Sequence, residues 1–211
     1  MKESRITNVA IALLFLSMIC IFSGVSYSIF NYFGQGMTNN VIQTGKIVFS
    51  YSDANGGSNG INIENAMPIP DTVGKNLSGA SEYFDFSVSA TTTTTDLTYE
   101  VAIQKGDDCT LDEKYVKVYL TTIDGTMENP TPLTNTTGGV VTYDTLVDTT
   151  NSLLTGKKIY YGTVNAGEVA YGQKFRFRMW VADQDDVNFD YNEVNDKYFS
   201  VKVNVSATGV N

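Results

Sequence analysis

Hydrophobic and polar residues alternate with a period of two along much of the chain after about residue 30. Successive side chains of a β-strand point to opposite faces, so this alternation predicts strands with one buried and one solvated face. The strongest five segments are rich in β-branched and aromatic residues, which favour strands. They are 84–90, 97–103, 116–120, 175–181 and 199–205.

Four weaker segments bring the prediction to about nine strands: 46–52, 60–65, 140–145 and 157–164. Residues 53–60 and 124–132 carry the Gly, Asn, Asp and Pro residues typical of loops. No segment after residue 30 has a helical apolar stripe of ordinary length.

Strands with one apolar face are typical of antiparallel sheets, and two such sheets bury their apolar faces against each other. We therefore predict an all-β fold, an antiparallel two-sheet β-sandwich with jelly-roll or Greek-key order, over residues 46–211. The strand order stays open. Phe86, Val118, Phe177 and Val201 lie mid-strand on apolar positions and are predicted to share one core.

The first 30 residues have the order of a secretory signal. Lys2 and Arg5 precede an apolar centre over 9–22, and small residues such as Ser26 and Ser28 follow it. The basic end is expected to stay inside, so the rest of the chain is expected to be extracellular or at the cell surface.

Cleavage and retention of this segment are both compatible with its length. The apolar centre has 14 residues, as in a cleaved signal, but counted through Phe30 it has 22, enough to span a membrane. The small residues allow cleavage before Tyr27 or before Ile29. We predict that 1–30 is a hydrophobic helix, either a signal peptide or a membrane anchor, and that 31–45 is an extended linker or a donor strand.

The net charge of the chain bears on which classes of macromolecule it can bind. The chain has a net charge of −9, and 12 basic and 22 acidic residues remain without residues 1–28. An acidic surface repels phosphate backbones, so a nucleic-acid partner is not expected.

The residue types present in the chain exclude several kinds of catalytic and metal site. The chain has no histidine, which excludes Ser-His-Asp and Cys-His catalysis and His-ligated zinc or copper. Cys109 is the only cysteine after the apolar segment, so an intrachain disulfide is excluded if that segment is removed. Paired carboxylates for glycoside chemistry stay possible, but the spacing singles out no pair. We expect neither an enzyme nor a resident cofactor.

One acidic stretch near the C-terminus could bind calcium. Asp186, Asn188 and Asp190 match the first three oxygen ligands of a calcium loop. Tyr191 stands where an EF-hand has its glycine, and the final bidentate glutamate is missing. The stretch is therefore either a calcium site of another type or a solvated acidic turn.

The order of these parts resembles the TasA/camelysin family of exported matrix-fibre proteins. The aromatic segment 27–33 is followed by a polar stretch and by Thr44-Gly45-Lys46-Ile47, and the chain closes with 175–180, an acidic loop and 198–203. The aspartate usual after the aromatic pair is replaced by Gly34. The resemblance implies a jelly-roll subunit that polymerises at the cell surface. The metalloprotease activity described for camelysins is not expected, because histidine is absent.

Three functions follow from these observations. The first is a structural subunit of a cell-surface or matrix fibre, which self-associates. The alternative is a β-sandwich that binds a glycan or a host surface through aromatics such as Tyr160, Tyr161 and Trp180, held in the membrane if residues 1–30 are retained. A viral or phage surface protein of the same fold is the third.

Overall fold

The computed structural model describes residues 31–35, 40–44, 47–53, 60–64, 67–79, 82–92, 95–150, 154–168, 170–183 and 189–210. The hydrophobic helix predicted for residues 1–30 lies outside these ranges. Within them, no helix is long and apolar enough to cross a membrane.

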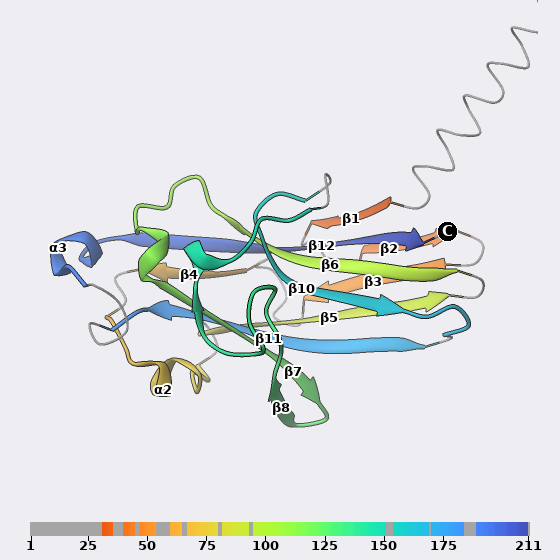
Figure 1. Cartoon of the computed structure of the whole chain (residues 1–211), viewed down its shortest axis with the longest axis horizontal. Coiled ribbons are helices and arrows are strands. Elements are labelled where there is room, and N and C mark those ends of the chain that lie inside the picture. Colours follow the sequence, from red (N-terminus) through yellow and green to blue (C-terminus); the bar gives the residue numbers. More distant parts are fainter. Residues whose placement is uncertain are drawn as a thin grey trace, which may run out of the picture.

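The described residues form two antiparallel sheets that pack face to face (Figure 1). We call the five-stranded one sheet A; it contains β1 (Asn31–Gln35), β4 (Gly60–Glu64), β6 (Asp96–Lys105), β10 (Lys157–Val164) and β12 (Tyr198–Val210). The seven-stranded sheet B contains β2 (Asn40–Thr44), β3 (Ile47–Asp53), β5 (Tyr83–Thr92), β7 (Val116–Asp124), β8 (Met127–Pro130), β9 (Val141–Thr142) and β11 (Tyr171–Val181).

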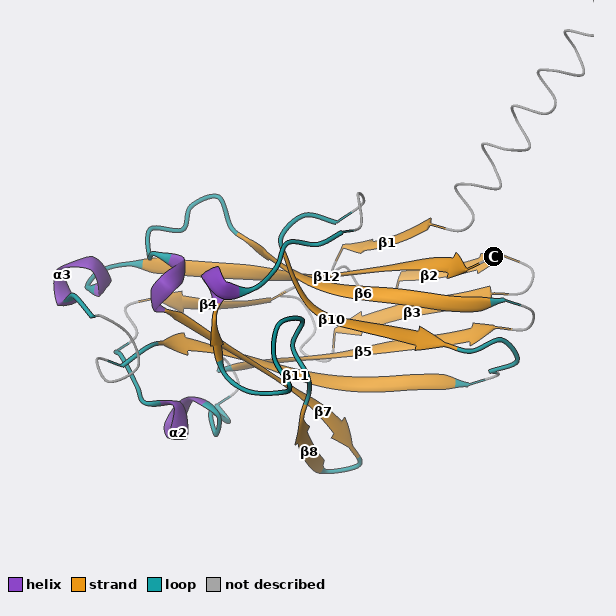
Figure 2. Cartoon of the chain, in the orientation of Figure 1, coloured by secondary structure: helices purple, strands orange, loops and turns teal. Residues whose placement is uncertain are grey.

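Helices are short, and Figure 2 shows the two labelled ones, α2 and α3, at one end of the sandwich. The helical elements are α2 (Asp71–Gly74), α3 (Tyr191–Val194), and the 3₁₀ turns η1 (Glu113–Tyr115) and η2 (Tyr143–Thr145). The all-β, two-sheet sandwich predicted from the alternation is confirmed.

The strand order, which the sequence left open, is that of a jelly roll. Sheet A has the order β4-β12-β6-β10, with β1 beside the second half of β12. Sheet B has the order β2-β3-β5-β11-β7-β8, with β9 also paired to β7. Successive strands from β4 to β7 and from β10 to β12 alternate between the sheets. The chain therefore crosses the sandwich repeatedly, and β12 ends up central in sheet A beside β6.

The inward faces of the two sheets form one apolar core. Phe86, Val118, Phe177 and Val201 are all buried in it, as predicted. Aromatic rings continue across the strands; the centroids of Phe86 and Phe175 are 5.0 Å apart. Such pairs add stability beyond the area that they bury.

Two parts of the sequence prediction are corrected. Residues 124–132 were expected to form a loop, but β8 lies within them and pairs with Thr121–Asp124 of β7. A four-residue strand without apolar alternation gives no periodic signal, and its pairing partner supplies the structure. The segment 140–145 is only partly a strand, because η2 begins at Tyr143, whose side chain turns into the core and donates a hydrogen bond to the carbonyl of Ile103 at 3.1 Å.

Residues 31–45 were predicted to be an extended linker or a donor strand. Residues 31–35 are extended, as a donor strand would be, but β1 pairs with residues 204–208 of the same chain. Residues 40–44 form β2, which pairs with β3. The two short strands therefore lie at the edges of the two sheets, β1 in sheet A and β2 in sheet B.

Truncation of a core phenylalanine should strongly destabilise the fold. Phe86→Ala or Phe177→Ala is expected to lower the free energy of unfolding by about 3–5 kcal/mol, because each ring is fully buried. Urea unfolding followed by tryptophan fluorescence measures this. The exposed control Asp107→Asn should change it by less than about 0.5 kcal/mol. Losses below about 1 kcal/mol for both phenylalanines would contradict the core assignment.

Candidate functional site

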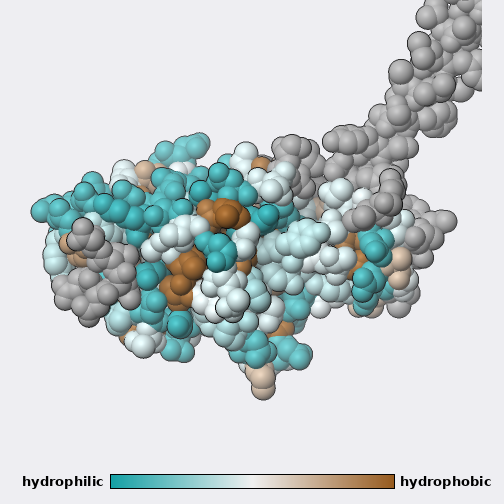
Figure 3. Space-filling view, in the orientation of Figure 1, coloured by the Kyte–Doolittle hydropathy of each residue, from teal (hydrophilic) through white to brown (hydrophobic). Residues whose placement is uncertain are grey.

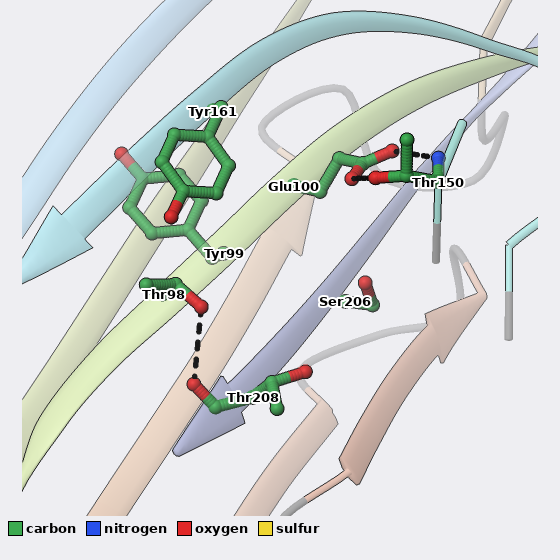
Figure 4. Close-up of a pocket in the computed structure, with 7 residues that line it drawn as sticks. All are labelled: Thr98, Tyr99, Glu100, Thr150, Tyr161, Ser206 and Thr208. Carbon is green, nitrogen blue, oxygen red and sulfur yellow. Dashed lines mark hydrogen bonds between the residues drawn. The ribbon is translucent and has the colours of Figure 1, made fainter. Parts of the chain in front are cut away.

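The outward face of sheet A carries an open pocket with a volume of about 360 Å³. Its lining comes from the three adjacent strands β6, β10 and β12 and from the loop before β10, as Figure 4 shows. The lining residues are mostly hydroxylated: Thr98, Tyr99, Glu100, Thr150, Tyr161, Ser206 and Thr208.

Strand register explains why these side chains meet. Tyr161 of β10 lies directly opposite Glu100 of β6, and Glu100 lies directly opposite Ser206 of β12. In antiparallel strands, opposed residues point to the same face. The outward positions of three strands therefore form one row across the sheet. Thr98 and Thr208 form part of the next row, and the hydroxyl of Thr98 donates to the carbonyl of Thr208 at 3.3 Å.

Tyr161 is the aromatic group of this site. Its side chain is 59% exposed, whereas the two other aromatics that the sequence put forward for ligand contact are covered. Tyr160 follows a register shift in β10 and turns inward, with its ring 5.0 Å from that of Phe175. Trp180 is only 2% exposed, because Gly74 of α2 packs directly on its indole ring. Only Tyr161 of the three can stack on a ligand.

Glu100 is the charged group of the site. It is only 6% exposed although it faces outward, because the loop before β10 covers it. Its carboxylate accepts hydrogen bonds from the Thr149 hydroxyl, from the Thr150 backbone N–H at 3.3 Å and from the Thr150 hydroxyl at 3.2 Å. No lysine or arginine forms an ion pair with it within the described part of the chain. Glu100 therefore holds the loop against the sheet while its negative charge stays without a counter-ion.

The floor of the pocket depends on Gly162. It lies opposite Tyr99, and a Cβ atom at position 162 would overlap the Tyr99 ring. The Tyr99 hydroxyl is 2.6 Å from that of Tyr171 in sheet B, a hydrogen bond between the two sheets. Burial raises the pKa of the Tyr99 phenol, so it stays neutral. This contact fixes Tyr99 beneath the exposed ring of Tyr161.

The sequence singled out neither the pocket nor its carboxylate. Thr98 and Glu100 stood only as polar positions of the alternating segment 97–103, which is the ordinary pattern of a solvated face, and Ser206 and Thr208 lie beyond the predicted strand 199–205. The loop that covers Glu100 lies about fifty residues further along the chain, and no local sequence pattern predicts a contact between such distant segments. Tyr161 was named, and it is the residue that the structure leaves exposed.

The residues proposed for calcium are only partly described. Asp186 and Asn188 lie outside the described residues. Asp190 caps the start of α3; its side chain accepts hydrogen bonds from the backbone N–H of Asn192 at 2.9 Å and from its side-chain amide at 3.1 Å. Within the described ranges, no group of three or more acidic or cysteine residues is placed to hold a metal ion. The calcium site stays a prediction from the sequence.

Cys109 has a structural contact. Its sulfur accepts a hydrogen bond from the backbone N–H of Ser200 at 3.2 Å, near the start of β12. The thiol is half-buried against the core. This contact ties the turn after β6 to β12.

The outward face of sheet B carries an ion-pair network. Arg176 of β11 makes two hydrogen bonds to Asp85 of β5, at 2.7 and 2.8 Å. Glu128 of β8 joins Arg176 at 2.6 Å and Arg178 at 2.7 Å. Hydrogen bonding from Arg178 lowers the pKa of Glu128. Bidentate pairing to planar guanidinium groups is specific in geometry, and here it holds the β7–β8 hairpin to the sheet. A hollow of about 280 Å³ beside it is lined by residues that include Asp85, Lys174 and Arg176.

The surface is mostly polar. Figure 3 shows small apolar patches separated by hydrophilic or neutral residues on the face in view. Exposed large apolar side chains of the described residues occur at separate places, such as Met67 before α2 and Met127 at the hairpin tip. Single exposed apolar residues are normal for a soluble surface.

No protein-family model matches the chain, and no curated protein sequence matches it. A comparison with solved structures found weak similarity to several proteins. One is TmCBM61 in complex with β-1,4-galactotriose, with 10% sequence identity and a TM-score of 0.19. The alignment covers 83% of this chain and 86% of TmCBM61. The K3 cleaved adhesin domain of Lys-gingipain from Porphyromonas gingivalis is 11% identical (TM-score 0.24; 82% and 98% covered). The xylan-binding module CBM15 is 9% identical (TM-score 0.22; 84% and 97% covered). At such low scores, the function of this chain has to be argued from its own residues.

The Glu128 network should make stability depend on pH. The pKa of Glu128 in the folded state lies below its ordinary value of 4.5, so its stabilising contribution is present above that value. The contribution is lost as the pH falls through the folded-state pKa. We expect the free energy of unfolding to fall less between pH 5 and about pH 3 in Glu128→Gln than in the parent protein. Asp107→Asn, the control, should follow the parent, and superimposable curves for Glu128→Gln and the parent would contradict the role of Glu128.

Thermal melting experiments test whether residues 183–193 bind calcium. If residues 183–193 only form a solvated acidic turn, Ca²⁺, Mg²⁺ and NaCl of matched ionic strength should raise the melting temperature equally, by screening. This is the expected result. A bound Ca²⁺ at 100 times its Kd would instead add about 2.7 kcal/mol of stability. A rise specific to Ca²⁺ that disappears in Asp186→Asn would show a genuine site.

Proposed function

We propose that this protein is a binding module for glycans on a cell or matrix surface, and that the outward pocket of sheet A is its binding site. The observation that carries the proposal is the exposed ring of Tyr161 directly beside a row of hydroxyl groups. A pyranose ring has apolar C–H faces and a polar rim. It would stack on the aromatic ring and exchange hydrogen bonds with the hydroxyls around it.

Several features of the pocket support a sugar rather than an apolar ligand. Thr98 and Thr208 supply hydroxyl groups at the pocket, whereas Ser206 is fully buried; the Thr98 hydroxyl donates to the Thr208 carbonyl and can still accept a hydrogen bond. Tyrosine supplies a large contact area at a small cost in side-chain entropy, which is why it is enriched at binding surfaces. The pocket is open to solvent, so an internal unit of a polymer could enter it as well as a chain end.

The rigidity of the strands that carry the site residues also supports the proposal. Strands, rather than free loops, carry Tyr161, Glu100 and Ser206. Sites on rigid elements keep their geometry without a ligand, so binding loses less conformational entropy. An exported β-sandwich with the predicted N-terminal signal or anchor would present such a face outside the cell.

The test is the affinity of Tyr161→Ala for glycans identified on a glycan array. Loss of the ring should weaken binding by about tenfold or more, which is about 1.4 kcal/mol. Tyr191→Ala is the matched control, because Tyr191 on α3 is exposed to nearly the same degree, 58%. If Tyr161→Ala and Tyr191→Ala bound as tightly as the parent protein, the site would be wrong. Absence of glycan binding by the parent protein would overturn the function itself.

A second candidate function is a fibre subunit, which the sequence resemblance implies. One observation favours it: two separate strands cover one edge of β12, β4 along residues 198–202 and β1 along 204–208. β1 is only five residues long and could pair equally well with β12 of another copy.

Electron microscopy tests the fibre hypothesis. Negative-stain images of residues 31–211 at high protein concentration should show filaments, and deletion of residues 31–35 should abolish them. Monomers in both samples, or unchanged filaments after the deletion, would contradict exchange of β1. Either result leaves the sheet A pocket to be judged by its own test.

A further inference from the structure

A neutral sugar would leave the buried carboxylate of Glu100 without a counter-charge. Glu100 is only 6% exposed, yet the hydrogen bonds that it accepts from the described residues all come from neutral groups of Thr149 and Thr150. Hydrogen bonds offset part of the cost of burying a carboxylate, but an unpaired charge in a desolvated site remains costly. A cationic group of a ligand would supply the missing counter-charge.

The carboxylate has room for such a partner. Its two oxygens offer about four acceptor positions, and Thr149 and Thr150 occupy three of them. Glu100 is also one of the residues that line the open pocket, and the proposal places the remaining acceptor position at the bound molecule. Among the described residues that line the pocket, Glu100 is the one acidic or basic residue.

Tyr161 is placed to hold the ring of the same sugar unit. Tyr161 and Glu100 lie directly opposite each other, with Cβ atoms about 4.5–5.5 Å apart, and in Figure 4 the carboxylate turns from the ring toward Thr150, so the two side chains would contact different parts of one sugar unit. The net charge of −9 raises the concentration of cations near the surface and repels acidic polymers.

We infer that the pocket binds a glycan unit that carries a free amino group, such as an unacetylated glucosamine residue. The inference rests on the proposed glycan-binding function and specifies its ligand class. The ammonium group pairs with Glu100, the sugar ring stacks on Tyr161, and the sugar hydroxyls bond to Thr98 and Thr208. N-acetylation removes the charge and with it the contact to Glu100.

Three β-1,4-linked tetrasaccharides of the same length separate these ligand classes: glucosamine, N-acetylglucosamine and glucose. Calorimetric titration of the parent protein, at a pH where the amine is protonated, should give an affinity for the glucosamine oligomer at least about tenfold above that for the others. Raising NaCl from low to physiological concentration and beyond should weaken this binding and leave binding of a neutral oligomer unchanged. The salt series needs no variant.

Glu100→Gln tests the residue directly. Glutamine keeps the shape and an acceptor oxygen for Thr149 and Thr150, so the loop stays in place while the charge is lost. The preference for glucosamine should disappear in Glu100→Gln and persist in Asp107→Asn, which removes one exposed carboxylate outside the pocket.

The outcomes are distinguishable. Equal affinity for all three oligomers, reduced by Tyr161→Ala, would overturn the amine preference and leave the glycan function standing. A glucosamine preference that Glu100→Gln leaves intact would place the amine elsewhere and overturn the assignment. No binding of any oligomer or of any arrayed glycan would overturn the proposed function.

Discussion

The fold depends on the burial of one face of sheet A against one face of sheet B. The alternating strands β6 and β12 supply one side of this contact and β5 and β11 the other, with Phe86, Phe177 and Val201 fully inside it. Because every second residue of these strands is committed to the core, the intervening residues are left to face outward. The outward rows of both sheets, and therefore the candidate site, follow from the register that the core imposes.

The charged side chains on the outward faces of the two sheets are paired differently. On sheet B, Arg176, Arg178, Asp85 and Glu128 pair with one another, so their charges are largely satisfied within the protein. On sheet A, Glu100 is covered by a loop whose described residues Thr149 and Thr150 offer it neutral donors. The first arrangement fastens a hairpin, whereas the second leaves a charge and an exposed ring beside an open pocket. This contrast is the physical basis for placing ligand binding on sheet A.

Sequence reasoning reached the parts of this structure that local periodicity controls. The strands β5, β6, β11 and β12 and their buried residues follow from strict alternation, and so does the two-sheet packing. The parts that it missed depend on contacts between distant segments. β8 forms because β7 is beside it, Trp180 is covered by α2, and Glu100 is covered by a loop about fifty residues away. Tyr161 could be named as an aromatic residue of a predicted strand, but not its direct opposition to Glu100, which requires the register of β10 on β6.

The most direct test of this account is a map of ligand contacts on the folded protein. In backbone amide NMR spectra, addition of the glucosamine tetrasaccharide should shift signals in 98–100, 149–150, 160–162 and 206–208, all around the sheet A pocket. Signals of β5, β8 and β11 on the opposite face should stay unchanged. Shifts confined to the outward face of sheet B, or an unchanged spectrum at saturating oligomer, would contradict the assignment of the site.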